Sequence, residues 1–230
     1  MQIDQLKQFY GFDAPLWKQY INSILGIFTG NWGMSIIYKK PVLSIIENRM
    51  LWTVGIVFVS TVISDFLGTL IGCFSAYKRQ TPLDSALYTF MTAFSEIPSF
   101  LVGFLLLYFI AGKARLLPLS GGQSPFIEYA SVFEAIRDIA IHGILPVTTL
   151  VLTSLSDYYI TIRQSMITVL GKDYISTAQP KGMTHARILF AHALPNAIPP
   201  IVARLCMSFS RILGGAVVIE SVFAYPGLGI

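Results

Sequence analysis

Ionisable side chains inside long apolar stretches are the residues of this chain best placed to do chemistry. Asp65 and Glu96 each stand in a stretch that is otherwise almost free of charge, and Arg204 and Arg211 stand with Glu220 in a third apolar stretch. A charge at membrane depth is costly, so such residues pair with one another or face water, and they are functional candidates by default. The chemistry they offer is a buried ion pair or the recognition of a charged substrate along a pathway.

Helix geometry places three of these charges at a similar depth. At about 1.5 Å per residue, Asp65 lies about 16 Å, Glu96 about 20 Å and Arg211 about 16 Å from the same-side ends of their stretches. Arg204 is nearer that end and can extend its side chain toward the membrane surface. We therefore predict that Arg211 faces a pathway or the protein interior and pairs with Glu96 or Asp65.

Patterns for enzymatic chemistry are missing from the sequence. There is no Gly-x-x-x-x-Gly-Lys-Ser/Thr loop to hold a phosphate and no Gly-x-Ser-x-Gly nucleophile turn. His185 and His192 lack the spacing and the acidic neighbour of a zinc protease, and the chain has 3 histidines in all. We predict no catalytic residues, no metal site and no cofactor in this chain.

Composition sets the class of protein. Of the 230 residues, 54% are hydrophobic and 12% are charged, and the mean hydropathy is +0.64. So few charges could not cover a water-facing surface, which excludes a soluble enzyme, a disordered chain and a coiled coil. The net charge of +4 is typical of cytoplasmic membrane loops rather than of nucleic-acid binding. Cys73 and Cys206 lie in apolar runs and are interpreted as small core residues rather than as a disulfide.

Four apolar stretches are long enough to cross a bilayer, which takes about 20 residues each. They are residues 51–76, 83–111, 141–162 and 197–224, and Pro98 predicts a kink in the second. The fold class is therefore all-α, a polytopic bundle of membrane helices.

The remaining segments are polar and connect these spans. Residues 1–50 are predicted to form an extracytoplasmic, interfacial segment with a short helix at 41–49, and residues 51–230 the transmembrane domain. The 112–140 loop is predicted to contain a short helix at 131–137. The density of Lys and Arg favours the cytoplasm for the 163–196 loop.

The 163–196 loop contains Gly and Pro residues at positions where helices commonly end. A short helix at 174–179, a stop at Gly182 and a second helix that ends before Pro195 would make a rigid cytoplasmic projection. An ordinary helical connection, with Gly and Pro only marking its turns, is the alternative for either residue taken alone.

Taken together, the residues of this loop resemble the signature loop of the permease subunits of binding-protein-dependent ABC importers. That pattern has an Ala-rich turn, Lys-Gly, about a dozen residues, then His-x-Leu-x-Asn and Pro. It is matched by Ala178, Lys181, Gly182, His192, Leu194, Asn196 and Pro199.

The resemblance covers essentially the whole chain. Residues 12–20, 30–35, 97–100, 117–121 and 215–229 also match motifs of the dipeptide and oligopeptide branch, in its B-type permease. Pro180 departs from it, because the family has Ala there and a proline disfavours helix in the residue before it. The family has a further membrane helix at each end, so we expect this chain to be a fragment that lacks the first and last helices.

The resemblance implies an architecture and a set of partners. It implies a permease of the type I ABC importer kind in the cell (inner or cytoplasmic) membrane, paired with a second homologous permease. Two cytoplasmic ATPase subunits would hydrolyse ATP, an extracytoplasmic binding protein would deliver di- or oligopeptides, and no nucleic acid is involved. The coupling loop would contact the ATPases through Ser176, Ala178, Lys181, Gly182, His192 and Asn196.

Two other classes compete with an ATP-driven importer. A secondary transporter or channel would need internal repeats or broken helices that coordinate ions, and the sequence indicates neither. A membrane scaffold without a transport role would leave the four charges at membrane depth unexplained.

Overall fold

A computed structural model describes residues 14–176, 183–184 and 187–230, without the side chains of Tyr174, Ser176 and residues 208–213. In these residues the regular structure is helical, apart from one isolated β-bridge between Met34 and Pro41. The chain divides into two compact units, residues 1–51 and 52–230. The second unit contains both clusters of buried hydrophobic side chains.

The first unit contains helix α2, Leu16–Thr29, and the first turns of α3, Val42–Tyr77. Helix α2 ends at Gly30, whose φ of 77° provides the left-handed turn that glycine adopts without strain. None of its side chains is buried. The predicted short helix at 41–49 is wrong as a separate element, because these residues are the first turns of α3 and continue directly into the first span.

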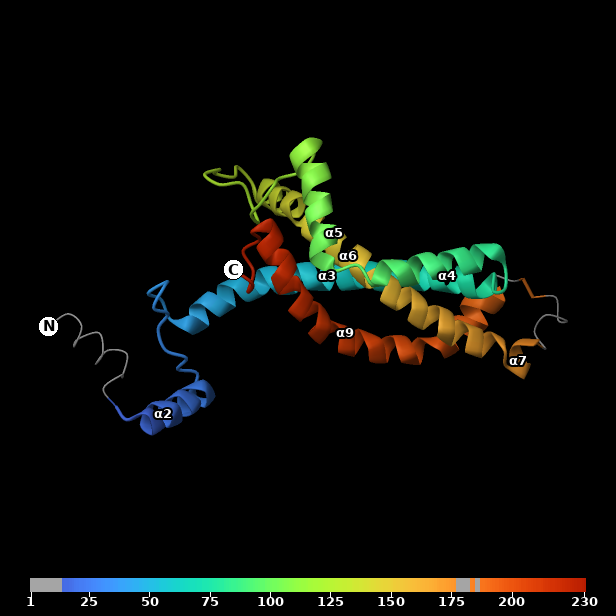
Figure 1. Ribbon diagram of the computed structural model, residues 1–230, viewed down its shortest axis with the longest axis horizontal. Coiled ribbons are helices and arrows are strands. Elements are labelled where there is room, and N and C mark those ends of the chain that lie inside the picture. Colours follow the sequence, from blue (N-terminus) through green and yellow to red (C-terminus); the bar gives the residue numbers. More distant parts are fainter. Residues whose placement is uncertain (1–13, 177–182, 185–186) are drawn as a thin grey trace. The chain divides into compact units, whose positions relative to one another are not determined.

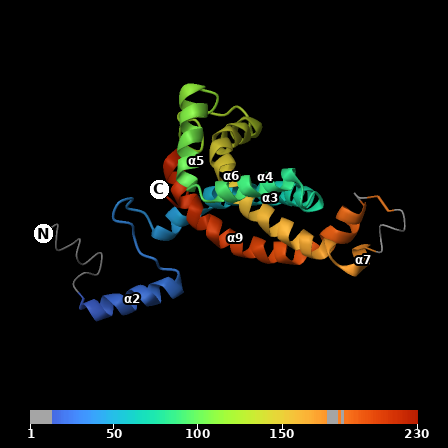
Figure 2. The same ribbon diagram turned by 45° about the vertical axis from the view of Figure 1, so that its right-hand side comes forward.

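The long helices of the second unit are α3, α6 (Val132–Leu170) and α9 (Leu194–Phe223), and they lie side by side in Figures 1 and 2. Ser131 caps α6, since its hydroxyl accepts a hydrogen bond from the Glu134 amide. The predicted helix at 131–137 is therefore the first two turns of α6, not a separate element.

Glycines set the close packing of α3 against α6. A Cβ on Gly68 would lie 2.6 Å from the Cβ of Tyr158, and one on Gly72 would lie 2.7 Å from Ile162. Small residues let membrane helices approach closely in this way. Cys73 packs in the same core as predicted, whereas Cys206 is exposed on α9, so its interpretation as a core residue is wrong.

The second predicted span is broken rather than kinked. Helix α4, Pro82–Ser95, is followed by α5, Ser99–Leu106, which continues through the π-helical turn η1, Leu107–Lys113. The two parts are bent by 95°, which makes this pair a broken span or a re-entrant loop. Pro98 disfavours helix at Ile97 and cannot donate a backbone hydrogen bond, so α4 ends here and α5 sets off in another direction (Figure 1).

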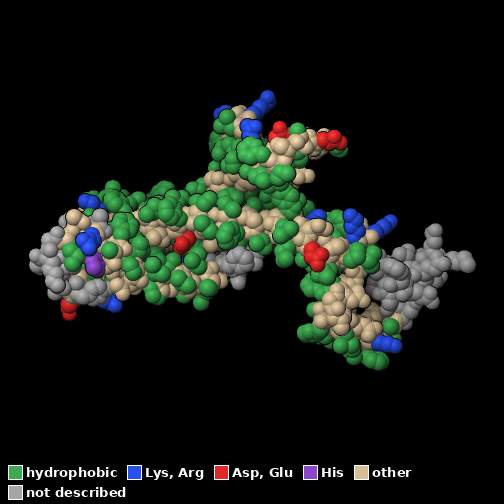
Figure 3. All heavy atoms as spheres, turned by 180° about the vertical axis from the view of Figure 1, so that it is seen from behind, with side chains coloured by type: hydrophobic (Ala, Val, Ile, Leu, Met, Phe, Trp, Pro, Cys, Tyr) green, Lys and Arg blue, Asp and Glu red, His purple; other side chains and the backbone are tan. Residues whose placement is uncertain are grey.

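By length and composition, 3 helices of the described residues can cross a membrane, or up to 4 if the bent pair is one span. Figure 3 shows hydrophobic side chains over most of the visible face, with few charges along the helices. This is the surface of a polytopic membrane protein, as composition predicts.

Candidate coupling and pathway residues

Asp84 and Arg163 form the most enclosed ion pair among the described residues. The Arg163 Nε and Nη2 atoms each lie 2.7 Å from one carboxylate oxygen of Asp84, and the two side chains are 16% and 3% exposed. Two parallel hydrogen bonds of this kind are the strong, directional form of an arginine–carboxylate contact. The pair joins the first turn of α4 to the C-terminal half of α6.

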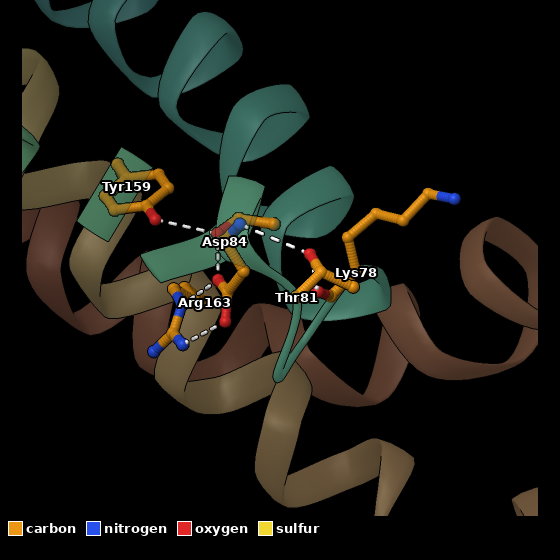
Figure 4. Close-up of polar contacts among 6 residues, drawn as sticks. Lys78, Thr81, Asp84, Tyr159 and Arg163 are labelled. Carbon is orange, nitrogen blue, oxygen red and sulfur yellow. Dashed lines mark hydrogen bonds and ion pairs between the residues drawn. The ribbon is translucent and has the colours of Figure 1, made fainter. Parts of the chain in front are cut away.

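Further polar and aromatic side chains contact this ion pair, and Figure 4 shows its polar contacts. Ser75 of α3 donates to Asp84 at 2.5 Å, and its oxygen lies 2.7 Å from the Tyr159 hydroxyl. The Arg163 guanidinium lies over the ring of Tyr88, 4.8 Å from its centre. This Asp84–Arg163 clamp therefore ties α3, α4 and α6 together close to the predicted coupling loop. Sequence analysis missed it, because charges at the ends of spans are expected on any membrane protein.

A second ion pair joins α6 to α9 and is more open. Arg204 Nη2 lies 3.1 Å from Asp157 Oδ2, and Arg204 Nη1 donates to the Thr161 hydroxyl at 2.6 Å. The side chains of Arg204 and Asp157 are 27% and 40% exposed. Arg204 was predicted as a pathway or ion-pair residue, whereas Asp157 was not singled out, because it stands at the predicted end of its span.

The other predicted intramembrane charges are not joined to each other by any described contact. Asp65 is partly buried, and its Oδ1 atom has no hydrogen-bond partner in the described part of the chain. Glu96 is exposed at the break between α4 and α5. The side chain of Arg211 lies outside the described residues, so its pairing with Glu96 or Asp65 stays a prediction.

The predicted coupling loop is described in part. Ser176 ends the short helix α7, Asp173–Ser176, whereas Ala178, Lys181 and Gly182 lie outside the described residues. His192 lies in the π-helical turn η2, Ile188–Ala193, and its carbonyl accepts a hydrogen bond from the Asn196 side chain at 2.7 Å.

The second helix of this loop does not end before Pro195 as predicted. Turn η2 runs directly into α9, where Pro195 occupies the first turn. Pro195 has no amide hydrogen to donate to the preceding turn, and the turn directly before it is the π-helical η2 rather than a regular α-helical turn. The loop is thus joined to α9 without a break.

A cavity of about 140 Å³ lies where α3, α6, α7 and η2 meet. It is lined by Ala76, Tyr77, Arg79, Leu170, Ile175, Ile188 and Leu189. Most of these lining residues are apolar, and Arg79 is the one cationic side chain among them. The arrangement suits the packing of a protein side chain rather than catalysis.

At the other end of α9, a buried carboxylate holds the turn that follows the helix. Glu220 is fully buried and accepts a hydrogen bond from the Gly229 amide at 2.8 Å. A Cβ on Gly227 would collide with this carboxylate, and one on Gly229 would collide with the backbone of Val217. The Leu228 amide also donates to Thr53 of α3 at 2.9 Å. The Pro-Gly-Leu-Gly sequence is therefore needed for close packing.

Comparison with known proteins agrees with these features. Residues 68–230 match the family of the binding-protein-dependent transport system inner membrane component. The chain is 32% identical to a probable peptide ABC transporter permease protein of Sinorhizobium fredii, over 99% of this chain and 70% of that protein.

Other relatives differ in their named cargo. The dipeptide transport system permease protein DppB of Escherichia coli is 31% identical, over 98% of this chain and 71% of that protein. The metal-staphylopine import system permease protein CntB of Staphylococcus aureus is also 31% identical, over 99% of this chain and 68% of that protein. Given the family match and the identity over nearly its whole length, the chain belongs to the inner-membrane permease components of binding-protein-dependent ABC transport systems.

Proposed function

We propose that this permease subunit imports di- or oligopeptides across the cytoplasmic membrane, driven by ATP hydrolysis on partner subunits. The observation that carries the substrate class is similarity over nearly the whole chain to relatives named as peptide permeases. The sequence itself contains no loop that could hold ATP, so the energy source is assigned to two cytoplasmic ATPase subunits.

Each element has a part in this proposal. The 163–196 loop, with Ser176, Ala178, Lys181, Gly182, His192 and Asn196, faces the cytoplasm and contacts an ATPase. Its continuity with α9 and the neighbouring Asp84–Arg163 clamp support a direct transfer of ATPase motion to the spans. Residues 1–50 lie on the extracytoplasmic side, where a binding protein delivers the peptide.

A second homologous permease completes the pathway. The intramembrane charges Asp65, Glu96, Arg204 and Arg211 are assigned to the pathway or to ion pairs that hold it open. The exposed Glu96 at the α4–α5 break and the open Asp157–Arg204 pair support this assignment.

Reconstitution tests the proposal. The complex of this chain with its second permease, ATPases and binding protein, all co-expressed, is placed in vesicles with ATP on the ATPase side. We expect ATP-dependent accumulation of a radiolabelled dipeptide or tripeptide, and no accumulation with a non-hydrolysable ATP analogue. Accumulation of a metal chelate without any peptide uptake would overturn the substrate class.

A further inference from the structure

The two ion pairs of α6 differ in a way that bears on function. The Asp84–Arg163 clamp has two contacts of 2.7 Å and is almost enclosed, whereas Asp157 and Arg204 approach to 3.1 Å and stay 40% and 27% exposed. The Nε atom of Arg204 is buried and has no hydrogen-bond partner in the described part of the chain. The second pair therefore leaves one N–H donor of Arg204 unused.

Along α6, the open pair lies inside the predicted third span, residues 141–162, whereas Arg163 of the clamp lies just beyond its end. Asp157 is about six residues before Arg163 on α6, which places it about 9 Å further from the coupling loop. At that depth, a half-exposed ion pair that faced lipid would be costly. The Asp157–Arg204 pair is stable at this position only where water or a polar partner contacts it.

Polar side chains continue this surface along α6. Thr153, Asp157 and Thr161 follow one another at a spacing of four residues, which puts them on one face of the helix. All three are partly exposed, and both threonine hydroxyls donate to the carbonyl one turn earlier, at 2.9 Å. Ser165, one turn further, donates to the Ala197 carbonyl of α9 at 3.1 Å. The row is therefore partly exposed from Thr153 to Thr161, and Ser165 contacts α9 one turn nearer the coupling loop.

We propose that Asp157 and Arg204 form a charge-recognition site in the aqueous pathway, where they bind the two termini of a zwitterionic peptide. The Arg204 guanidinium receives the substrate carboxylate, and the Asp157 carboxylate receives the substrate ammonium. The ion pair between them is the resting state, and Thr161 holds Arg204 in place while its partners exchange. This site rests on the proposed function, since it takes the substrate to be a peptide.

The test compares three peptides in the reconstituted complex: one with free termini, its N-acetyl form and its C-terminal amide. Because charge-assisted hydrogen bonds contribute most to such recognition, we expect R204Q to raise the KM for the free peptide at least about tenfold and to leave the amide unchanged. D157N should raise the KM for the free peptide and leave the N-acetyl form unchanged. R137Q, which changes an exposed arginine at the start of α6, is the matched control and should change none. Equal effects of either variant on all three peptides would make the pair a structural contact and overturn the proposal.

A second measurement does not depend on the substrate. In a C206S background, T153C should react with a membrane-impermeant thiosulfonate reagent in the assembled complex, whereas S156C, which replaces a fully buried serine of the same helix, should not. Protection of T153C would show that lipid or the second permease covers the row, and the proposal would fail. If the wild-type complex takes up no peptide but T153C reacts, the proposed substrate class is wrong, and so is the site for a zwitterionic peptide. The polar row of α6 would still face water.

Discussion

The Asp84 carboxylate accepts three hydrogen bonds from side chains of two other helices, Ser75 of α3 and Arg163 of α6. Removing one partner from an enclosed ion pair leaves the other charge uncompensated and costs about 3–5 kcal/mol, whereas replacing both by apolar residues is often neutral. The strength of the clamp therefore depends on both partners being present.

Asp84→Asn is accordingly expected to destabilise the permease by about 3 kcal/mol, since Arg163 would lose its counter-charge in an enclosed site. The measurement is the thermal unfolding midpoint of the purified complex in detergent. The double variant Asp84→Leu with Arg163→Met should recover most of the loss. A double variant as unstable as the sum of its single variants would contradict the clamp.

Gly229 is expected to tolerate no side chain, because a Cβ there meets the backbone of Val217, which cannot rotate away. Gly229→Ala should cost at least about 1–3 kcal/mol, the usual penalty for overpacking. Gly55→Ala is the control, since a Cβ at Gly55 has open space around it. Comparable unfolding midpoints for the two variants would mean that the turn after α9 is looser than described.

At the scale of elements, the coupling loop carries its own prediction. Gly182→Asp should leave membrane insertion intact and uncouple ATP hydrolysis from transport, because a bulky charged residue would disturb the turn that the sequence predicts at this glycine. A cysteine at position 178 should crosslink to an ATPase subunit in the assembled complex, whereas one at the exposed Gln123, in the loop predicted on the other side, should not. Crosslinking from position 123 and not from 178 would invert the predicted orientation.

Helix α2 is amphipathic along its whole length. At 100° per residue, its apolar side chains fill one half of the helix and its polar side chains fill the other. Leu25 and Phe28 on the apolar half are 56% and 85% exposed, and Trp17 is 66% exposed. Such a helix suits the membrane surface, with its aromatic residues at the level of the headgroups.

We therefore expect a nitroxide at Leu25 to be relaxed by oxygen, which concentrates in lipid, and one at Asn22, on the polar half, to be relaxed by a water-soluble nickel complex. Electron paramagnetic resonance of the reconstituted complex distinguishes the two. Equal access of the nickel complex to both positions would place α2 in water or against a soluble protein instead.

The spans could be predicted from the sequence, because hydrophobic length is a local property, but the ends of the helices could not. Residues 41–49 and 131–137 are polar enough to lie outside lipid, yet they are helical because a helix can continue into water once it has begun. Pro98 predicts a kink, but only packing sets the bend of 95°. Likewise, the pairing of Asp157 with Arg204 depends on the register of α6 against α9, which no local pattern encodes.

At the scale of the whole molecule, the described surface calls for partners and lipid rather than water. Large hydrophobic side chains are exposed along α3, α5 and α9, among them Phe66, Phe104 and Met207. In isolation such a surface would aggregate, so we expect the bilayer or a partner subunit to cover it.

It follows that the chain alone is not expected to transport. In vesicles that contain only this chain, peptide uptake should stay at the level of empty vesicles, whatever ion gradient is imposed. Uptake driven by a proton or sodium gradient without any ATPase would instead favour a secondary transporter. The complete complex, measured in parallel with ATP, provides the positive control.

Helix α6 extends over 39 residues, from the Ser131 cap to Leu170. The Asp84–Arg163 clamp holds it close to its C-terminal end. If Arg163 acts as a fulcrum, it divides α6 into a short arm of about 10 Å toward the coupling loop and a longer arm of about 26 Å that reaches Pro146, where proline interrupts the helical hydrogen bonds. A displacement of 1 Å at the short end would then move the helix at Pro146 by about 2.5 Å in the opposite direction. A small movement of an ATPase subunit bound to the coupling loop would thus become a larger movement of α6 inside the membrane.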